Sequence, residues 1–503
     1  MAALYAASFG IAYDQRRKAC LILGYRLTLH PLATYPGPLL AKVTDGYGGF
    51  HAALRRLHLI TYLNHQVYVR QGPNRLVFNT ATALQDIYQN PRVVKSPVYA
   101  AAQMAPQNSI LDTVDVEEHR RKRKFVSQPI SERSMRTFEP VMSEQIDTFI
   151  SQLGASSRRS EPVNVSERCM WLAGDVAGQF AFGYPLRLQT EAANRWLQRG
   201  LSFANARINV YMQLPVLHVL EPWIKSTFKK TRERYVRIMT EMIRARLALD
   251  KDAKQDLYSF AAEQEVDGEA LPRSEIWAEA FVFIVAGGST IAATLSAFFF
   301  YLSRYPDCYA KLAEEIRSSF HSAEEIRSGK QLRRCQYLHA CLNETFRMAA
   351  PNTATLWRRQ SADDKTEGPL VIDGNVIPRG TDVGVNIYSI HHNEEYFPDP
   401  FVFRPERWLE SSASELAVMQ KAWVPFIAGA HSCPGKAVTF LETSLTIART
   451  FWHFDFAVAP GKLGQAGAGE AGRTDGRDKE MEFQLYDTFS AMHDGPVLMF
   501  HGR

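Results

Sequence analysis

The chain has 503 residues, of which 46% are hydrophobic and 22% are charged, values that are ordinary for a globular protein. Its net charge of +5 suggests a basic docking face but is too small to argue for nucleic acid, so no nucleic-acid partner is expected. The six cysteines are scattered without paired spacing, which argues against a disulfide framework and favours a reducing compartment.

The first 29 residues form an interrupted apolar segment. Residues 1–13 are apolar, a charged stretch follows at residues 14–18, and apolar residues resume at 19–25. A membrane-spanning helix needs about 20 apolar residues. Residues 1–29 are therefore predicted to be a short, interrupted segment that resembles a membrane anchor, and a turn rich in proline follows at residues 35–38.

Long amphipathic stretches at residues 132–153 and 223–249 predict helices. Before them, a basic run at residues 115–123 contains His119 and Arg123. One helix face can present both side chains because they are four residues apart. Taken alone, this run is equally typical of a solvated basic face.

An uncharged apolar run at residues 280–302 lies within a helix that is predicted to begin near Ser274 and to end before Pro306. The run is long enough to span a membrane, but a helix that is apolar all round is also typical of the core of a large protein. The sequence Ala-Gly-Gly-Ser-Thr at residues 286–290 interrupts it. Hydropathy alone does not separate the two interpretations.

The last third of the chain mixes helix and strand. A helix predicted at residues 337–349 carries Glu344 and Arg347, an i, i+3 pair of the kind usually found on solvated helix surfaces. Residues 370–377 have Asp-Gly at their centre, which predicts a β-hairpin. Residues 461–478 are rich in glycine, alanine and charge, which predicts a flexible surface loop. The chain is therefore expected to be mainly α with a minor β region.

The stretch Phe-Ile-Ala-Gly-Ala-His-Ser-Cys-Pro-Gly at residues 426–435 places Cys433 between two glycines and before a helical run. A thiolate is a strong metal ligand, and glycines let a backbone approach a flat cofactor closely. Backbone N–H groups and a helix start would both favour the thiolate. Taken alone, such a cysteine is more often an inert buried thiol.

The spacing Phe426-x-x-Gly429-x-His431-x-Cys433-x-Gly435 resembles the haem-binding signature of the cytochrome P450 family. The resemblance implies that Cys433 is the axial ligand of the iron of haem b. It also implies that His431 meets a haem propionate.

Three further motifs resemble motifs of this family and occur along the chain in the same order as in the family. Glu344-x-x-Arg347 with Arg407 of a Pro-Glu-Arg segment would form a buried network that supports the haem site without taking part in chemistry. His119 and Arg123 match a pair that holds a propionate, and Arg358 matches another propionate contact.

Residues 286–290 resemble the part of the long distal helix that passes over the haem, so the apolar run is expected to be a core helix. Thr290 matches the alcohol that guides protons to the oxygen site. Ser289 stands where the family usually has an acid, which leaves the usual proton route in doubt.

The resemblance implies the cytochrome P450 fold as a single haem-thiolate domain at residues 30–503. The expected function is a monooxygenase that uses O2 and electrons from NADPH, delivered by a separate flavoprotein, NADPH-cytochrome P450 reductase. The substrate would be an apolar small molecule, such as a polyketide, terpenoid or alkaloid of fungal secondary metabolism. The location would be the cytoplasmic face of the endoplasmic reticulum membrane.

Two alternatives remain beside this interpretation. One is a haem-thiolate isomerase or dehydratase that acts on a peroxide without O2 or reductase, although Thr290 and the compact cysteine loop argue against it. The other is a non-enzymatic protein that binds haem or an apolar ligand. By family position, the substrate is expected to face residues 99–108, 203–214, 349–356 and 487–491, which include Phe203, Tyr211, Met212 and Phe489.

Overall fold

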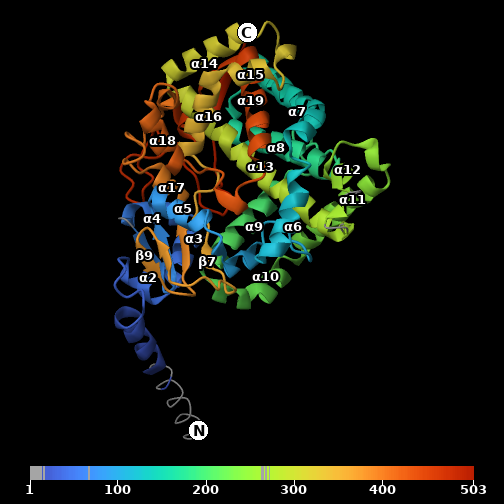
Figure 1. Ribbon diagram of the computed structural model, residues 1–503. Coiled ribbons are helices and arrows are strands. Elements are labelled where there is room, and N and C mark those ends of the chain that lie inside the picture. The colour runs from blue at the N-terminus through green and yellow to red at the C-terminus, as the bar shows by residue number, and fades with distance from the viewer. Residues whose placement is uncertain (1–13, 15–16, 66–67, 262–264, 267–268, 271) are drawn as a thin grey trace, which may run out of the picture.

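The computed structural model describes residue 14 and residues 17–65, 68–261, 265–266, 269–270 and 272–503. Helices dominate these residues, and strands such as β7 and β9 gather beside α2 to α5 on one side of the molecule (Figure 1). The predicted mainly α fold with a minor β region is confirmed.

A helix at residues 17–28 precedes the labelled elements. The α-helices are α2 (Leu39–Val43), α3 (Gly46–Ala53), α4 (Leu57–Asn64), α5 (Ala81–Tyr88), α6 (Val116–Ser127), α7 (Glu132–Arg158), α8 (Val165–Phe182), α9 (Trp196–Gln213), α10 (Glu221–Thr227), α11 (Lys229–Leu247), α12 (Leu257–Ala261), α13 (Arg273–Arg304), α14 (Pro306–Ser319), α15 (Lys330–Arg334), α16 (Gln336–Met348), α17 (Ile387–His391), α18 (Ala413–Ala422) and α19 (Lys436–His453). The 3₁₀ helices are η1 (Pro97–Ala102), η2 (Pro215–Leu220), η3 (Lys251–Ala253), η4 (Ala323–Glu325), η5 (Pro405–Trp408), η6 (Gly429–His431) and η7 (Gly461–Gln465). The strands are β1 (Tyr68–Gly72), β2 (Arg75–Phe78), β3 (Val93–Lys95), β4 (Val163–Asn164), β5 (Glu265–Val266), β6 (Glu269–Ala270), β7 (Arg358–Gln360), β8 (Leu370–Ile372), β9 (Asn375–Ile377), β10 (Asp382–Val385), β11 (Phe454–Val458) and β12 (Val497–Gly502).

The largest sheet joins strands from distant parts of the chain, in the order β1-β2-β10-β7-β3. β2 runs parallel to β10, with Leu76 opposite Val383, and both side chains are fully buried. β3 runs antiparallel to β7 and places Lys95 opposite Arg358. The sheet therefore brings two basic side chains together from residues that are far apart in the sequence. The predicted hairpin at residues 370–377 is confirmed as β8 and β9.

Helix α13 passes through the middle of the molecule, in contact with α8, α16 and α19 (Figure 1). A Cβ at Gly288 of α13 would lie only 3.7 Å from the Cα of Gly174 in α8, so the two helices approach closely where both residues lack side chains. Among the described residues, α13 is the one helix long and apolar enough to cross a membrane, and 72% of its apolar window is buried inside the protein. The core-helix interpretation is confirmed.

Two segments differ from their expected structure. The helix expected at residues 223–249 is divided at Phe228 into α10 and α11. The prediction missed this division because the apolar periodicity carried no sign of the break. The segment at residues 461–478, expected to be a flexible loop, packs against the body. Gly464 is buried, and the buried Arg477 donates to the carbonyl of Leu485 (3.0 Å).

We expect Phe298→Ala to lower the free energy of unfolding by about 3–5 kcal/mol, because it opens a cavity around a side chain that is fully buried in α13. Urea denaturation of the purified protein measures the change. Phe203→Ala is the control, since Phe203 is about half exposed in α9. Equal, small losses in both variants would contradict the core role of this part of α13.

Candidate active site

A tight loop holds Cys433 immediately before α19. The Cys433 N–H donates to the carbonyl of Phe426 (2.8 Å), and Gly429 adopts a φ of 73°. A Cβ at Gly429 would lie 1.9 Å from the carbonyl oxygen of Tyr88 in α5, so the backbone fits only with glycine there. Gly435 follows the sulfur at the start of α19, and its N–H donates to that sulfur. The loop therefore holds the sulfur in a fixed place.

The Cys433 side chain opens into an internal cavity of about 340 Å³. Its accessible surface faces this cavity, so the thiol is exposed to the cavity while protein surrounds it. Burial raises the pKa of the thiol, while the Gly435 N–H and the Arg123 guanidinium act to lower it. A cysteine that ligates a metal is deprotonated, so iron at this position would oppose the effect of burial.

Five basic side chains line the same cavity, namely Lys95, His119, Arg123, Arg358 and His431. The structure thus brings together the four that the sequence predicted and adds Lys95. Nδ1 of His431 lies 3.1 Å from Nε2 of His119. Arg358 donates to the Tyr99 hydroxyl (3.3 Å) and Lys95 to the carbonyl of Leu111 (2.9 Å).

Lys95, His119 and His431 of this basic cluster have lowered pKa values, and burial is the largest cause of each shift. Burial, together with the nearby Arg358, lowers the pKa of Lys95 to about 7. Burial and the surrounding cations lower the pKa of His119 to about 3 and that of His431 to about 2. A buried cation is favoured when an anion joins it. The site therefore fits haem b, which would offer iron to the Cys433 sulfur and two carboxylates to the basic cluster.

Helix α13 supplies another wall, where Ser289 and Thr290 face different spaces. Thr290 lines the large cavity and donates to the carbonyl of Ala286 (2.5 Å). Ser289 lines a second cavity of about 70 Å³, and its hydroxyl lies 2.7 Å from that of Ser490. Successive helix residues point about 100° apart, so neighbours in sequence need not share a site.

A buried acid, Glu279, lines the large cavity nearer the start of α13 than Thr290. It accepts from the N–H of Ile110 (2.8 Å) and lies 3.7 Å from Nζ of Lys122. Burial raises its pKa to about 8, although Lys122 acts to lower it. Sequence reasoning missed Glu279, although its position directly before the uncharged run at residues 280–302 was a signal that could have found it.

The predicted substrate-facing stretches line the large cavity only in part. Tyr99, Asn352 and Phe489 do so, each from a different predicted stretch. Phe203, by contrast, is about half exposed and packs against Phe228, with ring centroids 4.9 Å apart. Helix α9 turns other residues, including Ile208, toward the cavity, because only one face of a helix can line it.

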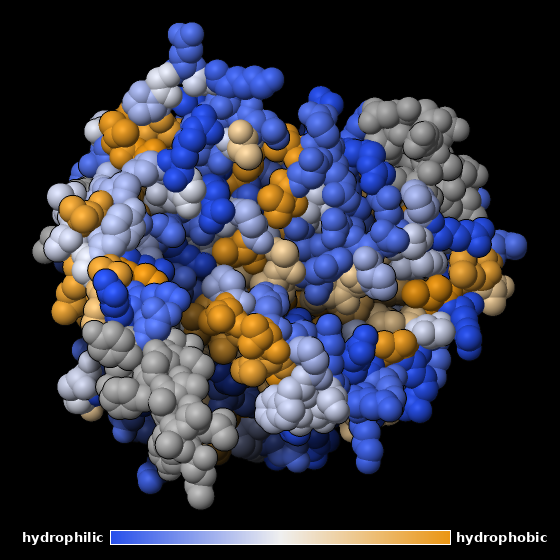
Figure 2. All heavy atoms as spheres, turned by 90° about the horizontal axis from the view of Figure 1, so that it is seen from below, coloured by the Kyte–Doolittle hydropathy of each residue, from blue (hydrophilic) through white to orange (hydrophobic). Residues whose placement is uncertain are grey.

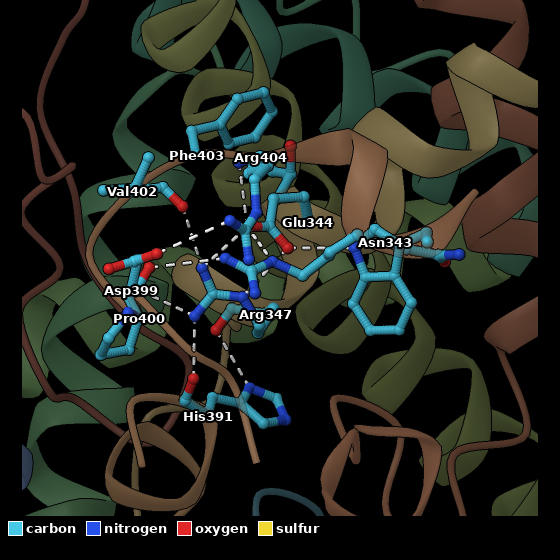
Figure 3. A network of polar contacts seen from close by, with 12 residues as sticks. Asn343, Glu344, Arg347, His391, Asp399, Pro400, Val402, Phe403 and Arg404 are labelled. Carbon is cyan, nitrogen blue, oxygen red and sulfur yellow. Dashed lines mark hydrogen bonds and ion pairs between the residues drawn. The ribbon is translucent and has the colours of Figure 1, made fainter. Parts of the chain in front are cut away.

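Behind the cysteine loop lies a buried network around Glu344 of α16 (Figure 3). Oε1 of Glu344 accepts from Arg347 (2.8 Å) and from Arg407 (2.9 Å), and Oε2 accepts from Trp408 (3.0 Å). Burial acts to raise the pKa of Glu344, but the two guanidinium groups hold it below the ordinary value. The carboxylate is therefore ionised and satisfied.

The network reaches the cysteine loop through His391. Arg347 donates to the carbonyls of His391 (2.9 Å) and Pro400 (2.8 Å), as Figure 3 shows. Nε2 of His391 accepts from the Val424 N–H (3.0 Å), so Nδ1 carries the proton and donates to the carbonyl of Arg347 (3.1 Å). Val424 lies two residues before Phe426. The contacts thus connect Glu344 to the start of the loop.

Comparisons with known proteins agree with this geometry. The sequence profile described as Cytochrome P450 matches residues 61–465. The cytochrome P450 monooxygenase poxM of Penicillium oxalicum is 33% identical, over 95% of this chain and 91% of its own. The cytochrome P450 monooxygenases apf7 of Gibberella fujikuroi and AKT7 of Alternaria alternata are 33% and 32% identical, each over 96% of both chains. All three relatives are named monooxygenases. They support neither the isomerase or dehydratase alternative nor the non-enzymatic one.

Arg407→Ala should leave the Glu344 carboxylate short of a partner in a fully buried place, at a cost of about 3–5 kcal/mol. We expect little haem-loaded protein, measured as the ratio of haem to polypeptide after purification. Arg404→Ala is the matched control, because the Arg404 side chain is exposed and only its backbone N–H reaches Glu344. Normal haem content in Arg407→Ala would contradict the supporting role of the network.

Proposed function

This chain belongs to the cytochrome P450 family, and from that premise we propose how its own residues serve a haem-thiolate monooxygenase. The observation that carries the proposal is the Cys433 thiol, which opens into a cavity lined by five basic side chains. We assign Cys433 as the axial ligand of the iron, within a catalytic domain at residues 30–503. Phe426, Gly429 and Gly435 would shape its loop.

The basic cluster would hold the two carboxylates of haem b. Lys95 and Arg358 offer cationic donors from facing positions on β3 and β7. Beside the cysteine loop, Arg123 offers its guanidinium, and His119 and His431 offer ring N–H groups. When bound, haem with a cysteinate ligand supplies the activation of dioxygen. Glu344, Arg347 and Arg407 would contribute by supporting the loop and would stay apart from the chemistry.

Thr290 is the hydroxyl group that we assign to proton handling in the large cavity. Its hydroxyl donates to the carbonyl of Ala286, so rotation about its side chain can redirect the proton into the cavity. Ser289 lies in the adjoining small cavity and would act only through another group.

The substrate would be an apolar small molecule. Most of the large cavity is lined by apolar side chains, among them Val126, Phe180, Val282, Phe283, Ile387 and Phe489. Because the relatives are fungal, we favour a secondary metabolite, such as a polyketide, terpenoid or alkaloid, as the substrate class. Glu279 would let this substrate carry one hydrogen-bonding group, because its carboxyl group is buried on the cavity wall.

Electrons would come from NADPH through a separate flavoprotein reductase. Positive side chains on the surface favour an acidic partner through long-range attraction. Arg120 and Lys124 are exposed on α6, which also carries His119 and Arg123, and Lys436 is exposed at the start of α19, directly after the cysteine loop.

Apolar side chains on one face would rest on the membrane of the endoplasmic reticulum. Figure 2 shows apolar patches near the middle of the face that carries α2 and α10. Exposed apolar residues there are Leu39, Leu40, Val219, Leu220 and Trp223. The helix at residues 17–28 exposes several more, and residues 1–13, 15 and 16 of the anchor-like segment lie outside the described residues.

Cys433→Ser should abolish the thiolate spectrum of the reduced carbon-monoxide complex and all turnover with NADPH, reductase and O2, because a hydroxyl donates less electron density than a thiolate. Difference spectroscopy and haem content are measured together. Cys20→Ser is the control, since Cys20 is exposed on the N-terminal helix. A thiolate spectrum in Cys433→Ser would remove Cys433 as the ligand.

Deleting residues 1–29 should move much of the protein from the membrane fraction to the soluble fraction of expressing cells. Adding Val219→Glu and Trp223→Glu should release the rest, because both side chains are exposed on the apolar face. Val418→Glu, on α18, which lies beyond α5 and away from α2 and α10, is the matched control (Figure 1). Full-length protein that is already soluble would refute membrane attachment.

A further inference from the structure

The two cavities meet at a pair of polar side chains. Asn205 of α9 and Ser490 line both the large cavity beside Cys433 and the small cavity behind α13. Ser289 lines the small cavity, and Thr290 lines the large one. Asn205 and Ser490 are therefore the polar side chains, among the described residues, that border both spaces.

The hydroxyl groups of Ser289 and Ser490 make direct contact at that boundary. Their oxygens lie 2.7 Å apart, and either hydroxyl can be the donor. Ser289 also donates to the carbonyl of Val285 (2.7 Å). While Ser289 donates to Val285, Ser490 is the donor between the two hydroxyls, and rotation of both reverses the direction.

The small cavity offers groups that hold water. Oδ1 of Asn205 and the hydroxyl of Tyr235 are buried without a hydrogen-bond partner among the described residues, and Asn205 is only 2% exposed. Buried polar groups of this kind are normally satisfied by water where protein gives no partner. The cavity's volume of about 70 Å³ is enough for several waters, at roughly 10–15 Å³ for one.

The turn at residues 486–492 fixes Ser490 in place. The Thr488 hydroxyl donates to the carbonyl of Ser490 (2.7 Å), and the Ala491 N–H donates to the carbonyl of Pro351 (2.8 Å). Phe489 adopts a φ of 66°, a backbone conformation that a phenylalanine rarely takes. Such strain persists only where the surroundings determine the conformation, so the position of Ser490 is strongly constrained.

We propose that Ser289 and Ser490 form a hydroxyl bridge that passes protons from water in the small cavity into the large cavity. Ser289 accepts the excess proton that water in the small cavity brings in from solvent, its own proton moves to Ser490, and Ser490 releases its proton into the large cavity, so the water and both hydroxyls end neutral. Monooxygenation consumes two protons with two electrons and O2, giving a hydroxylated product and water. The bridge rests on the proposed function and would replace the acid that the family usually has beside Thr290.

The test compares Ser490→Ala, Ser289→Ala and the double variant in haem-loaded protein with reductase, NADPH and O2 as the only substrate. NADPH oxidation is followed in water and in deuterium oxide. We expect each single variant to slow oxidation about tenfold and to raise the solvent isotope effect. The double variant should be no slower than either single one, because both hydroxyls serve one route.

Two variants separate a proton route from a packing effect. Ser490→Thr keeps the hydroxyl and should restore most of the rate. Ser202→Ala removes a hydroxyl from the small cavity away from the bridge, where it donates to the carbonyl of Gln198 (2.9 Å), and should keep the wild-type rate. Formation of the reduced carbon-monoxide complex needs electrons alone, so its rate should be equal in all variants.

The possible failures are distinct. Wild-type protein that loads haem but oxidises no NADPH would contradict the proposed function. Ser490→Ala at the wild-type rate and isotope effect, or additive losses in the double variant, would overturn the bridge alone. A crystal structure of the haem-loaded wild type supplies a measurement independent of turnover. Ordered water within hydrogen-bond distance of Ser289 and Asn205 would support the bridge, and a dry small cavity would overturn it.

Discussion

One buried carboxylate organises the backbone behind the cysteine loop. Glu344 cannot stay ionised inside the protein unless cations and donors surround it, so it draws Arg347, Arg407 and Trp408 to a single point. Arg347 then uses its remaining donors on backbone carbonyls, including that of His391. Through these contacts, the need to satisfy one charge determines the course of the backbone that leads to the cysteine loop.

Helix α13 meets two opposing demands. It must be apolar to fill the core, and phenylalanine side chains such as Phe298 are fully buried there. It also brings the Thr290 hydroxyl to the large cavity beside Cys433, and that hydroxyl donates to the carbonyl of Ala286 one turn earlier. The hydroxyl is thereby satisfied within its own helix at no cost in unpaired polar groups, and remains free to turn outward.

The sequence predicted the parts of the site whose residues lie in short, ordered motifs. The cysteine loop and the Glu344 network followed from the resemblance of their motifs to the cytochrome P450 family, because taken alone the cysteine indicated an inert thiol and the Glu344–Arg347 pair a solvated helix surface. Lys95 did not, because a lysine at the end of a short strand is ordinary until the fold places it beside the cavity. Ser490 lies in the stretch 487–491 that was expected to face the substrate, but its contact with Ser289 required the fold. The different surroundings of Ser289 and Thr290 required the packing of α8, α9 and the turn at residues 486–492.

The parallel pairing of β2 with β10 has a consequence for synthesis of the chain. β2 finds this neighbour only after residues 382–385 have been made, roughly 300 residues later. At about 5–20 residues per second, the ribosome needs about 15–60 s to cover that distance. During this interval one edge of β2, which carries the apolar Leu76 and Phe78, stays unpaired. Unpaired strand edges promote aggregation. Yield in a foreign host should therefore depend on how well its chaperones protect nascent chains.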